Sequence, residues 1–500
     1  MTTIHHGSVL PLESAEPQPE EVNDPQKSSG KFYPPWTFDY MFSDLRNDPQ
    51  KYLETSPDTV VKLRSLGTYG MKDPGPGKIH GVPVPTIYTF LAQFVDHDIT
   101  FERGSAGISL VNPEPIGPAQ MAEQIVNSRS PNLDLDNVYG PDLKGQLAPR
   151  DPNDPNKLRI GEVDFGQPAR GLPPAKDIYN DLPRDIKGTA LIGDPRDDEN
   201  VVLAQLHVAF LRAHNALVDR GLPFGQARKL LRQHYQWIVL DDLLERIADP
   251  NIVKKVRYHG PTFFNPSAKA FFMPLEFSVA AFRFGHSKVR DAYAHFNSLQ
   301  EDATLGTLFS NAGHPLASDW VIDWSAFLDT ESLQHFPRPI DTTLAFPLLN
   351  LQPPQLGPGD PEGNLAVRNL LRGYVLSLPT GQAVAGAMAS QGIEPLTNEQ
   401  ILSVAATEEQ RQILNGLPEF KGPSLMEKTP LWFYILAEAA FYSRGHHLGP
   451  VGSTIVAEVL IGILRNSSDS ILCDPAWRPT LGATPGKFDI EDLLKLAGVF

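Results

Sequence analysis

The stretch FLAQFVDHDITFE at 90–102 places polar side chains within what otherwise reads as a buried helix. Gln93, Asp96 and His97 are spaced i, i+3 and i+4 and share one helix face, whereas Asp98 is turned about 100° further round. Buried polar and charged groups cost free energy unless they are paired or bind something. One interpretation is a core histidine satisfied by a neighbouring aspartate, and the other is a binding site on each of the two faces.

A second cluster, SPNLDLDNVYG at 130–140, offers oxygen ligands. Ser130, Asn132, Asp134 and Asp136 fall at every second position, so in an extended loop their side chains would point the same way. Such hard oxygen ligands suit calcium. The spacing and central glycine of an EF-hand are absent, and an Asx-rich turn without metal is the alternative.

A third cluster, GDPRDDEN at 193–200, has the composition of a helix start, with an acidic N-cap followed by proline. Arg196 and Glu199 share a face of that helix, where taken alone they are typical of a surface ion pair. His207 and His214 lie two turns apart further along. They could be ligands, but such histidines more often serve packing.

Two further groups interrupt apolar helical stretches. His286 ends the stretch EFSVAAFRFGHSKVR, and the preceding Gly285 would let a flat ligand approach the backbone closely. Asn369 and Arg372 share the face of another helix that is otherwise apolar. Each group taken alone is usually structural, so their meaning depends on which of them meet.

Several stretches carry apolar residues at helical spacing and must position these groups. They are residues 84–98, 197–220, 225–248, 276–290, 364–376, 430–443 and 453–465. Sustained alternation of the kind that marks strands is scarce, and 47 Pro and 39 Gly indicate long, shaped loops. The sequence therefore predicts a mainly α fold.

The composition excludes several classes of function. A formal net charge of −16 would repel phosphate backbones and anionic membranes, so we expect no nucleic-acid partner. Cys473 is the only cysteine, which excludes an internal disulfide, a cysteine zinc site and an iron–sulfur ligand set. Any metal must therefore use histidine and oxygen ligands.

The chain is expected to form a flexible N-terminal tail over 1–30 and one catalytic domain over 31–500. The first residues carry no secretory signal pattern, and the apolar run STIVAEVLIGIL is too short to span a bilayer. We expect no membrane span and, by default, a cytoplasmic protein, with export by a route without a cleaved signal as the alternative.

Considered jointly, QFVDHDIT, SPNLDLDNVYG, GDPRDDEN and FRFGH resemble the motifs of the animal-type haem peroxidase superfamily, in the pattern of its bacterial members. The resemblance runs in consistent order from roughly residue 30 to residue 470. It implies a single large helical domain with long Pro/Gly-rich loops around a buried haem b. The implied activity is oxidation of halides, thiocyanate or small aromatic donors by hydrogen peroxide.

The resemblance also implies roles for the residues around the iron. His97 would be the distal acid/base, Gln93 would position halide and water, and Arg196 would be the distal arginine. His286 would bind the iron, and Asn369 would orient its imidazole.

The second cluster resembles the calcium loop of the family. Asp98, Ser130, Asn132 through its carbonyl, Asp134 and Asp136 would be the calcium ligands. Asp136 replaces a more usual hydroxyl ligand and would tighten the site by adding negative charge.

Haem attachment is implied by two carboxylates. Asp96 and Glu199 match positions at which mammalian members form ester bonds to haem, and Arg283 and Arg372 would lie near the propionates. Asn200 stands where myeloperoxidase has a methionine that forms a sulfonium link, so at most two ester bonds are expected.

Two other classes of function compete with a peroxidase. The cyclooxygenase-like fatty-acid dioxygenases of the same superfamily carry a radical-forming tyrosine three residues before the proximal histidine, a position that is Arg283 here. A calcium-stabilised binding protein without haem would require His97, Arg196 and His286 to be coincidental. The residues favour the peroxidase.

Overall fold

The computed structural model describes most of the chain. The described residues are 36–75, 81–103, 108–117, 120–121, 125–140, 148–174, 176–266, 271–351, 360–416 and 424–500. The predicted tail at 1–30 lies outside them.

Helices make up most of the regular structure, which confirms the predicted mainly α class. The longer helices are α1 (Pro57–Ser65), α2 (Ile87–Ile99), α5 (Val201–Asp219), α6 (Phe224–Trp237), α8 (Pro250–His259), α13 (Leu365–Val375), α16 (Glu408–Asn415), α17 (Leu431–Ser443), α18 (Pro450–Asn466) and α19 (Ile490–Ala497). The shorter ones are α4 (Asp136–Tyr139), α7 (Leu244–Ile247), α9 (Gly285–Lys288), α10 (Leu305–Ser310), α11 (Trp324–Leu328), α12 (Phe346–Leu349), α14 (Gly381–Ala387) and α15 (Asn398–Ser403).

The strands are short and form two small sheets. They are β1 (Trp36–Asp39), β2 (Glu102–Arg103), β3 (Val126–Asn127), β4 (Phe272–Pro274), β5 (Ala292–Ala294) and β6 (Asp302–Thr304). The first sheet has the order β2-β3-β1-β4, in which β1 pairs antiparallel with β3 and parallel with β4. This sheet ties the segment that follows α2 to the segment that precedes α9.

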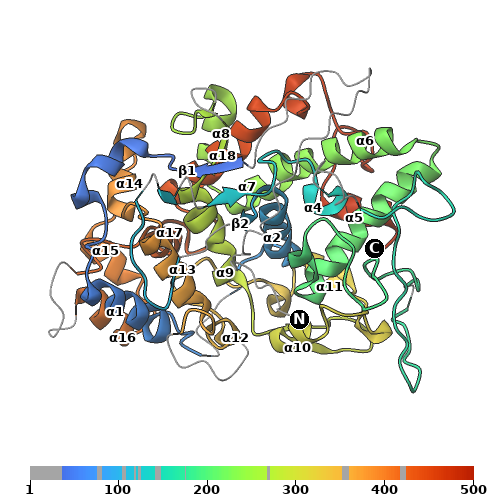
Figure 1. The fold of residues 1–500 in the computed structure, drawn as a ribbon, viewed down its shortest axis with the longest axis horizontal. Coiled ribbons are helices and arrows are strands. Elements are labelled where there is room, and N and C mark those ends of the chain that lie inside the picture. The colour runs from blue at the N-terminus through green and yellow to red at the C-terminus, as the bar shows by residue number, and fades with distance from the viewer. Residues whose placement is uncertain are drawn as a thin grey trace.

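The helix α2 lies near the middle of the molecule, between the groups of α5 and α6 and of α13 and α17 (Figure 1). Nearly all of its side chains are buried, and Phe94 stacks on Phe210 of α5 with ring centroids 4.6 Å apart. One connected apolar core extends from Phe38 to Val499. The polar residues of α2 are therefore held in place by a packed apolar core.

The helix α5 is long and apolar enough to span a membrane by length and composition, and it is the only such helix among the residues that the structure describes. Most of it is buried inside the protein, where it packs against α2, α6 and α19. Core packing accounts for its apolar character.

The predicted helix at 276–290 is wrong in detail, because it divides into three pieces. A π-helix (Glu276–Ala280) and a 3-10 helix (Ala281–Phe284) precede α9. Arg283 Nε donates to the carbonyl of Ser278 at 3.0 Å, so a side chain satisfies a carbonyl within the irregular turn. Such turns often occur at functional sites, and here the change of pitch precedes His286 directly.

The predicted helix start at 193–200 is also altered. Asp194 caps a short 3-10 helix (Pro195–Asp198), and Asn200 then caps α5 by accepting a hydrogen bond from the amide of Leu203 at 2.9 Å. The helix predicted from 197 thus begins at 201. Because a tight turn precedes it, Arg196 and the two acids that follow are all buried.

Candidate active site

A cavity of ≈ 90 Å³ lies between α2 and α9. Its polar lining comes from Gln93 and Asp96 on α2 and from His286 on α9, together with Asn200. The rest is mainly apolar: Thr89, Phe90, Ala92, Phe282, Gly285, Val289, Leu305, Phe309, Leu348 and Leu365. The fold thus brings the predicted distal residue Gln93 and the proximal residue His286, almost 200 positions apart, to one cavity, whereas His97 and Arg196 are not among its lining residues.

The lining fits a haem in its chemistry. An imidazole, two amides and a carboxylate converge between apolar walls, as a flat apolar cofactor with one metal ligand requires. A Cβ added to Gly285 would meet nothing within 4 Å, so this backbone borders open space. Ligand pockets usually measure about 300–1,000 Å³. Binding of a haem must therefore move the lining side chains apart.

On the proximal side, Asn369 joins two predicted residues. Its Nδ2 lies 2.7 Å from Nδ1 of His286, and its Oδ1 accepts a hydrogen bond from Nη1 of Arg283 at 2.7 Å. Burial and the charges of Arg283 and Arg368 lower the pKa of His286 to about 3. The imidazole is therefore neutral at physiological pH, the form that can bind iron.

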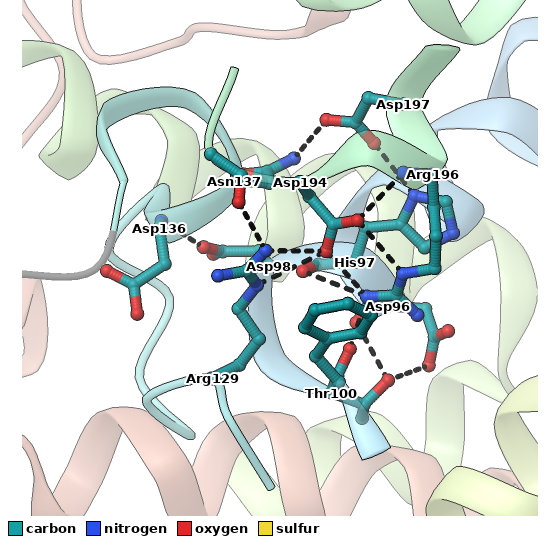
Figure 2. Close-up of polar contacts among 12 residues, drawn as sticks. Asp96, His97, Asp98, Thr100, Arg129, Asp136, Asn137, Asp194, Arg196 and Asp197 are labelled. Atoms are coloured by element: carbon teal, nitrogen blue, oxygen red, sulfur yellow. Dashed lines mark hydrogen bonds and ion pairs between the residues drawn. The ribbon is translucent and has the colours of Figure 1, made fainter. Parts of the chain in front are cut away.

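On the distal side, His97 and Arg196 lie beside each other. Arg196 Nη2 donates to the carbonyl of His97 at 3.4 Å and to that of Thr100, and the guanidinium lies 4.6 Å from the ring centroid of Phe101. Asp194 binds the same guanidinium through both carboxylate oxygens, at 3.0 Å and 2.7 Å (Figure 2). These contacts fix Arg196 next to the distal helix.

Asp194 is shared by two arginines. Arg129 donates to its carboxylate from Nε and Nη2 at 3.2 Å and 2.8 Å, opposite Arg196 (Figure 2). Burial alone would raise the pKa of Asp194, but the two guanidinium groups hold it well below its usual value. Burial would lower the pKa of Arg196, and the Asp194 carboxylate raises it instead. Both groups remain charged in the core.

The two predicted ester carboxylates, Asp96 and Glu199, both act on Arg196, whose pKa each of them raises. Asp96 also accepts a hydrogen bond from Thr100 Oγ1 at 2.9 Å and lines the cavity. Asp96 further raises the pKa of Arg283, although burial lowers that pKa overall. Asp96 therefore acts on arginines from both predicted sides of the haem.

Arg372 does not lie with Arg283, although both were predicted to lie near the haem propionates. It is buried, and burial lowers its pKa to about 10. It forms an ion pair with Glu102 of β2, and neither residue borders the cavity. Sequence reasoning missed Arg368 on the same helix, which acts electrostatically on both His286 and Glu199.

Asp197 is another residue that sequence reasoning missed. Its carboxylate lies 2.7 Å from Nδ1 of His97 and 2.7 Å from Nδ1 of His207. The sequence does place three consecutive acids after proline and arginine, but the helical pattern alone does not tell which of them turns inward. His207, interpreted from sequence as a packing histidine, contacts the same carboxylate.

The predicted calcium residues are close together but not in the predicted conformation. The segment from Ser130 to Asp134 bends, Leu135 has a left-handed backbone with φ 62°, and Asp136 starts α4. The strand-like alternation is therefore wrong. Asp98 Oδ1 instead accepts a hydrogen bond from the amide of Asp136 at 2.6 Å, which ties α2 to the loop.

The other predicted ligands are held by contacts within the loop. Ser130 donates its amide to Oδ2 of Asp136 at 3.2 Å, and Asn132 Nδ2 donates to Oγ of Ser130 at 2.8 Å. The carbonyl of Asn132 accepts a bond from the amide of Asp134 at 2.9 Å and keeps a second lone pair. That lone pair is the one available to a cation.

Three carboxylates of this region favour a cation. Burial raises the pKa of Asp98 and Asp134 well above the usual value, and the Asp136 charge raises both further. One oxygen of Asp98 and one of Asp134 are buried without a hydrogen-bond partner. Among the described residues no three acidic or histidine side chains are already gathered at metal-binding distance. The donor set consists of the oxygen ligands that calcium takes, and the carboxylates would have to move closer together to hold an ion.

Gly193 lets the segment that carries Arg196 pack directly on the backbone of Asp136 and Asn137. A Cβ there would lie 2.3 Å from the carbonyl oxygen of Asp136 and 2.6 Å from that of Asn137. We expect Gly193→Ala to destabilise the protein by about 1–3 kcal/mol, the usual cost of overpacking. Denaturant unfolding measures this loss.

The control for that variant is Gly225→Ala. Gly225 lies in the first turn of α6, and an added Cβ would meet nothing within 4 Å. It should stabilise the protein slightly, by about 0.5–1 kcal/mol. An unchanged stability of Gly193→Ala would contradict the close approach of the two segments.

The family described as animal haem peroxidase matches residues 80–315, a stretch that contains His97, Arg196 and His286. The chain belongs to the animal-type haem peroxidase superfamily. Membership of a haem peroxidase superfamily implies a haem cofactor.

Relatives of this haem peroxidase family member include the human protein named probable oxidoreductase PXDNL. The two are 27% identical over 230 residues, which is 43% of this chain and 15% of that protein. The chain therefore spans a small part of that relative's length.

Solved structures of the superfamily fold are also similar. Peroxidase A from Dictyostelium discoideum matches 89% of this chain and 90% of its own, with a TM-score of 0.52 and 16% identity. A fatty acid alpha-dioxygenase from Oryza sativa matches 82% of this chain and 74% of its own, with a TM-score of 0.53 and 13% identity. These identities establish the fold alone, so they do not separate the two activities.

Proposed function

We propose that this chain is a haem peroxidase that uses hydrogen peroxide to oxidise halides, thiocyanate or small aromatic donors. The observation that carries the proposal is the cavity between α2 and α9, in which Gln93 and Asp96 face the segment of His286. His97 follows the lining residue Asp96 in sequence and Arg196 lies within reach of its charge; neither lines the cavity, and both are buried and fixed by hydrogen bonds. Membership of the family supports the same activity.

Residues of the cavity and of the adjacent distal segments would have separate roles in the reaction. His286 would bind the iron through Nε2. This requires the ring proton on Nδ1, so the Asn369 amide would have to rotate and turn its oxygen, instead of the Nδ2 that now lies 2.7 Å away, toward Nδ1. The haem supplies an iron that peroxide can bind and oxidise. His97 would take the first proton of the peroxide and return it to the departing oxygen, which leaves as water. Arg196 would stabilise the negative charge that develops as the O–O bond breaks.

Gln93 would position water or a halide, because its amide lines the cavity on the same helix face as His97. Arg283 would bind a haem propionate with the guanidinium donors that remain, because its Nη1 already donates to Asn369. Arg372 would reach a propionate only if its ion pair with Glu102 opens, since the pair lies outside the cavity lining.

Calcium is proposed as a second cofactor. Asp98, Asp134 and Asp136 would supply carboxylate oxygens, with Ser130 and the carbonyl of Asn132 completing the set. Support comes from the buried, mutually repelling carboxylates. Because Asp98 adjoins His97, an ion here would hold the distal helix in place.

We also propose that Asp96 and Glu199 attach the haem by ester bonds. Each bond would replace a C–H of a haem methyl group by C–O, a two-electron oxidation in which hydrogen peroxide is reduced to water. Acid–organic extraction of peroxide-treated protein should leave haem on the polypeptide. The same extraction of the double variant Asp96→Asn, Glu199→Gln should release the haem from the polypeptide.

The matched control for haem attachment is Asp198→Asn. Asp198 is a buried carboxylate next to Glu199, but it is ion-paired with Arg184, at 2.6 Å. It should retain haem as the wild type does. Complete extraction of haem from the peroxide-treated wild type would contradict the ester proposal.

A fatty-acid dioxygenase is the second candidate, because the fold is also that of the Oryza sativa enzyme. Two observations favour the peroxidase. Arg283 occupies the position three before His286, and its guanidinium is bound to Asn369. Among the described residues that line the cavity there is no tyrosine to form a radical.

One experiment separates the two activities. Protein produced with a haem supply should show a haem absorption band, and hydrogen peroxide should drive oxidation of bromide, iodide or a phenolic dye. Linoleate alone should cause no oxygen uptake. His286→Ala should lose the haem band. Oxygen uptake with linoleate and without peroxide would favour the dioxygenase instead.

A further inference from the structure

The carboxylate of Asp197 is enclosed by three hydrogen-bonding groups, all fully buried. Oδ1 lies 2.7 Å from Nδ1 of His97. Oδ2 lies 2.7 Å from Nδ1 of His207 and accepts a bond from Nδ2 of Asn137 at 3.0 Å. None of the four side chains has measurable contact with solvent. The arrangement joins the distal helix α2, the 3-10 helix Pro195–Asp198, α4 and α5.

Asp197 is ionised in this setting. Burial would raise its pKa, but the hydrogen bonds from His207 and His97 lower it below the usual value. An ionised carboxylate can only accept hydrogen bonds. Both histidines must therefore carry their proton on Nδ1, which leaves the lone pair of each neutral ring on Nε2.

We infer that Asp197 is the positioning residue of the distal histidine: it holds His97 as the Nδ1–H tautomer, with Nε2 as the base. This inference rests on the proposed function, because the tautomer matters only if His97 accepts a proton from a ligand. It adds a residue that neither the helical periodicity nor the motif of the distal arginine identifies.

The neighbours of Asp197 make its orientation rigid. His207 and Asn137 both donate to Oδ2. A rotation of the carboxylate that moves Oδ2 away would break both of these hydrogen bonds. Oδ1 therefore stays directed at His97. When Nε2 takes a proton, the ring becomes a cation beside a buried anion, which stabilises it. The same contact leaves the proton on Nδ1 throughout, so the proton at Nε2 is the one that can be returned.

The geometry makes asparagine a worse substitute than alanine. In Asp197→Asn the amide oxygen would take the place of Oδ2, since two donors converge there, and the NH₂ group would face Nδ1 of His97. Nδ1 would then have to accept, which moves the ring proton to Nε2 and removes the base. Asp197→Ala imposes no tautomer, so a fraction of the rings stays active.

Binding of cyanide to the ferric haem protein tests this without turnover. Hydrogen cyanide must lose its proton to bind as the anion, so its association requires a base in the distal pocket. Carbon monoxide binds to the ferrous protein without proton transfer and reports access alone. We expect Asp197→Asn to slow cyanide association by about 10²–10⁴-fold, and Asp197→Ala to slow it less. Carbon monoxide association should change little in either variant.

Asp198→Asn and Asp198→Ala are the matched controls, because Asp198 is the adjacent buried carboxylate and pairs with Arg184 instead. Both should bind cyanide at the wild-type rate. The inference is overturned if Asp197→Asn matches the wild type, if it is faster than Asp197→Ala, or if carbon monoxide association slows equally.

The outcome for the wild type separates the inference from the function on which it rests. A wild type without a haem band would contradict the proposed function. A wild type that binds haem and cyanide normally, with unaffected Asp197 variants, would contradict the inference alone. If Asp197→Asn does not fold, Asp197→Ala against Asp198→Ala decides, since only the former should slow cyanide association.

Discussion

His97→Ala is expected to slow the reaction of the ferric protein with hydrogen peroxide by about 10²–10⁴-fold, the usual range for removing a positioned acid/base. The physical reason is that the described cavity lining holds no imidazole except the proposed iron ligand His286, so no other lining histidine can replace His97, which follows Asp96 on α2. Stopped-flow absorption of the haem band measures the rate constant. Haem content should be unchanged, because His97 does not bind the iron in the proposed arrangement.

The control for that variant is His214→Ala. His214 is equally buried on α5, where Nδ1 lies 2.9 Å from the hydroxyl of Tyr139 and Nε2 lies 2.9 Å from the carbonyl of Asn156. Its loss should lower stability but leave the peroxide reaction unaltered. A normal rate in His97→Ala would remove the assignment of the distal base.

Removal of calcium should have the second large effect. Without the cation, Asp98, Asp134 and Asp136 have no positive charge between them, and burial together with the charge of Asp136 disfavours the ionised forms of Asp98 and Asp134. Prolonged chelation should therefore lower the melting temperature. Because Asp98 adjoins His97 in α2, the haem absorption spectrum should change in the same titration.

The variant Asp134→Asn provides the comparison for calcium. It removes one of the three repelling charges, so chelation should lower its melting temperature less than that of the wild type. Elemental analysis should find one calcium per wild-type chain. Folded protein that contains none, or equal sensitivity of both proteins to chelation, would contradict the calcium site.

Local periodicity was enough to place several residues correctly. Gln93 and Asp96 share a face because an α-helix repeats every 3.6 residues, and both do line the cavity. The helices predicted at 364–376 and 430–443 begin and end within a residue of α13 and α17. Which side chains share a helix face depends only on their spacing in the sequence. Tertiary information is therefore not needed to predict it.

Other local predictions were changed by contacts made elsewhere. The loop from Ser130 to Asp136 looks extended by its alternation, but Leu135 turns it because the amide of Asp136 bonds to Asp98. The helix before His286 changes pitch where Arg283 bonds to the carbonyl of Ser278. In both places a hydrogen bond from outside the regular backbone pattern outweighs local propensity.

The sequence by itself determined the mainly α class, the helix that carries His97 and, through the resemblance, the set of residues proposed to surround a haem. Only the tertiary structure decided which of these residues meet. Asn369 lies between His286 and Arg283, Arg372 pairs with Glu102 instead, and Asp197 joins His97 across 100 positions of chain. The physical reason is that periodicity specifies which face of an element a side chain occupies. The partner of a buried charge is specified by whichever opposite group the packing brings within hydrogen-bonding distance.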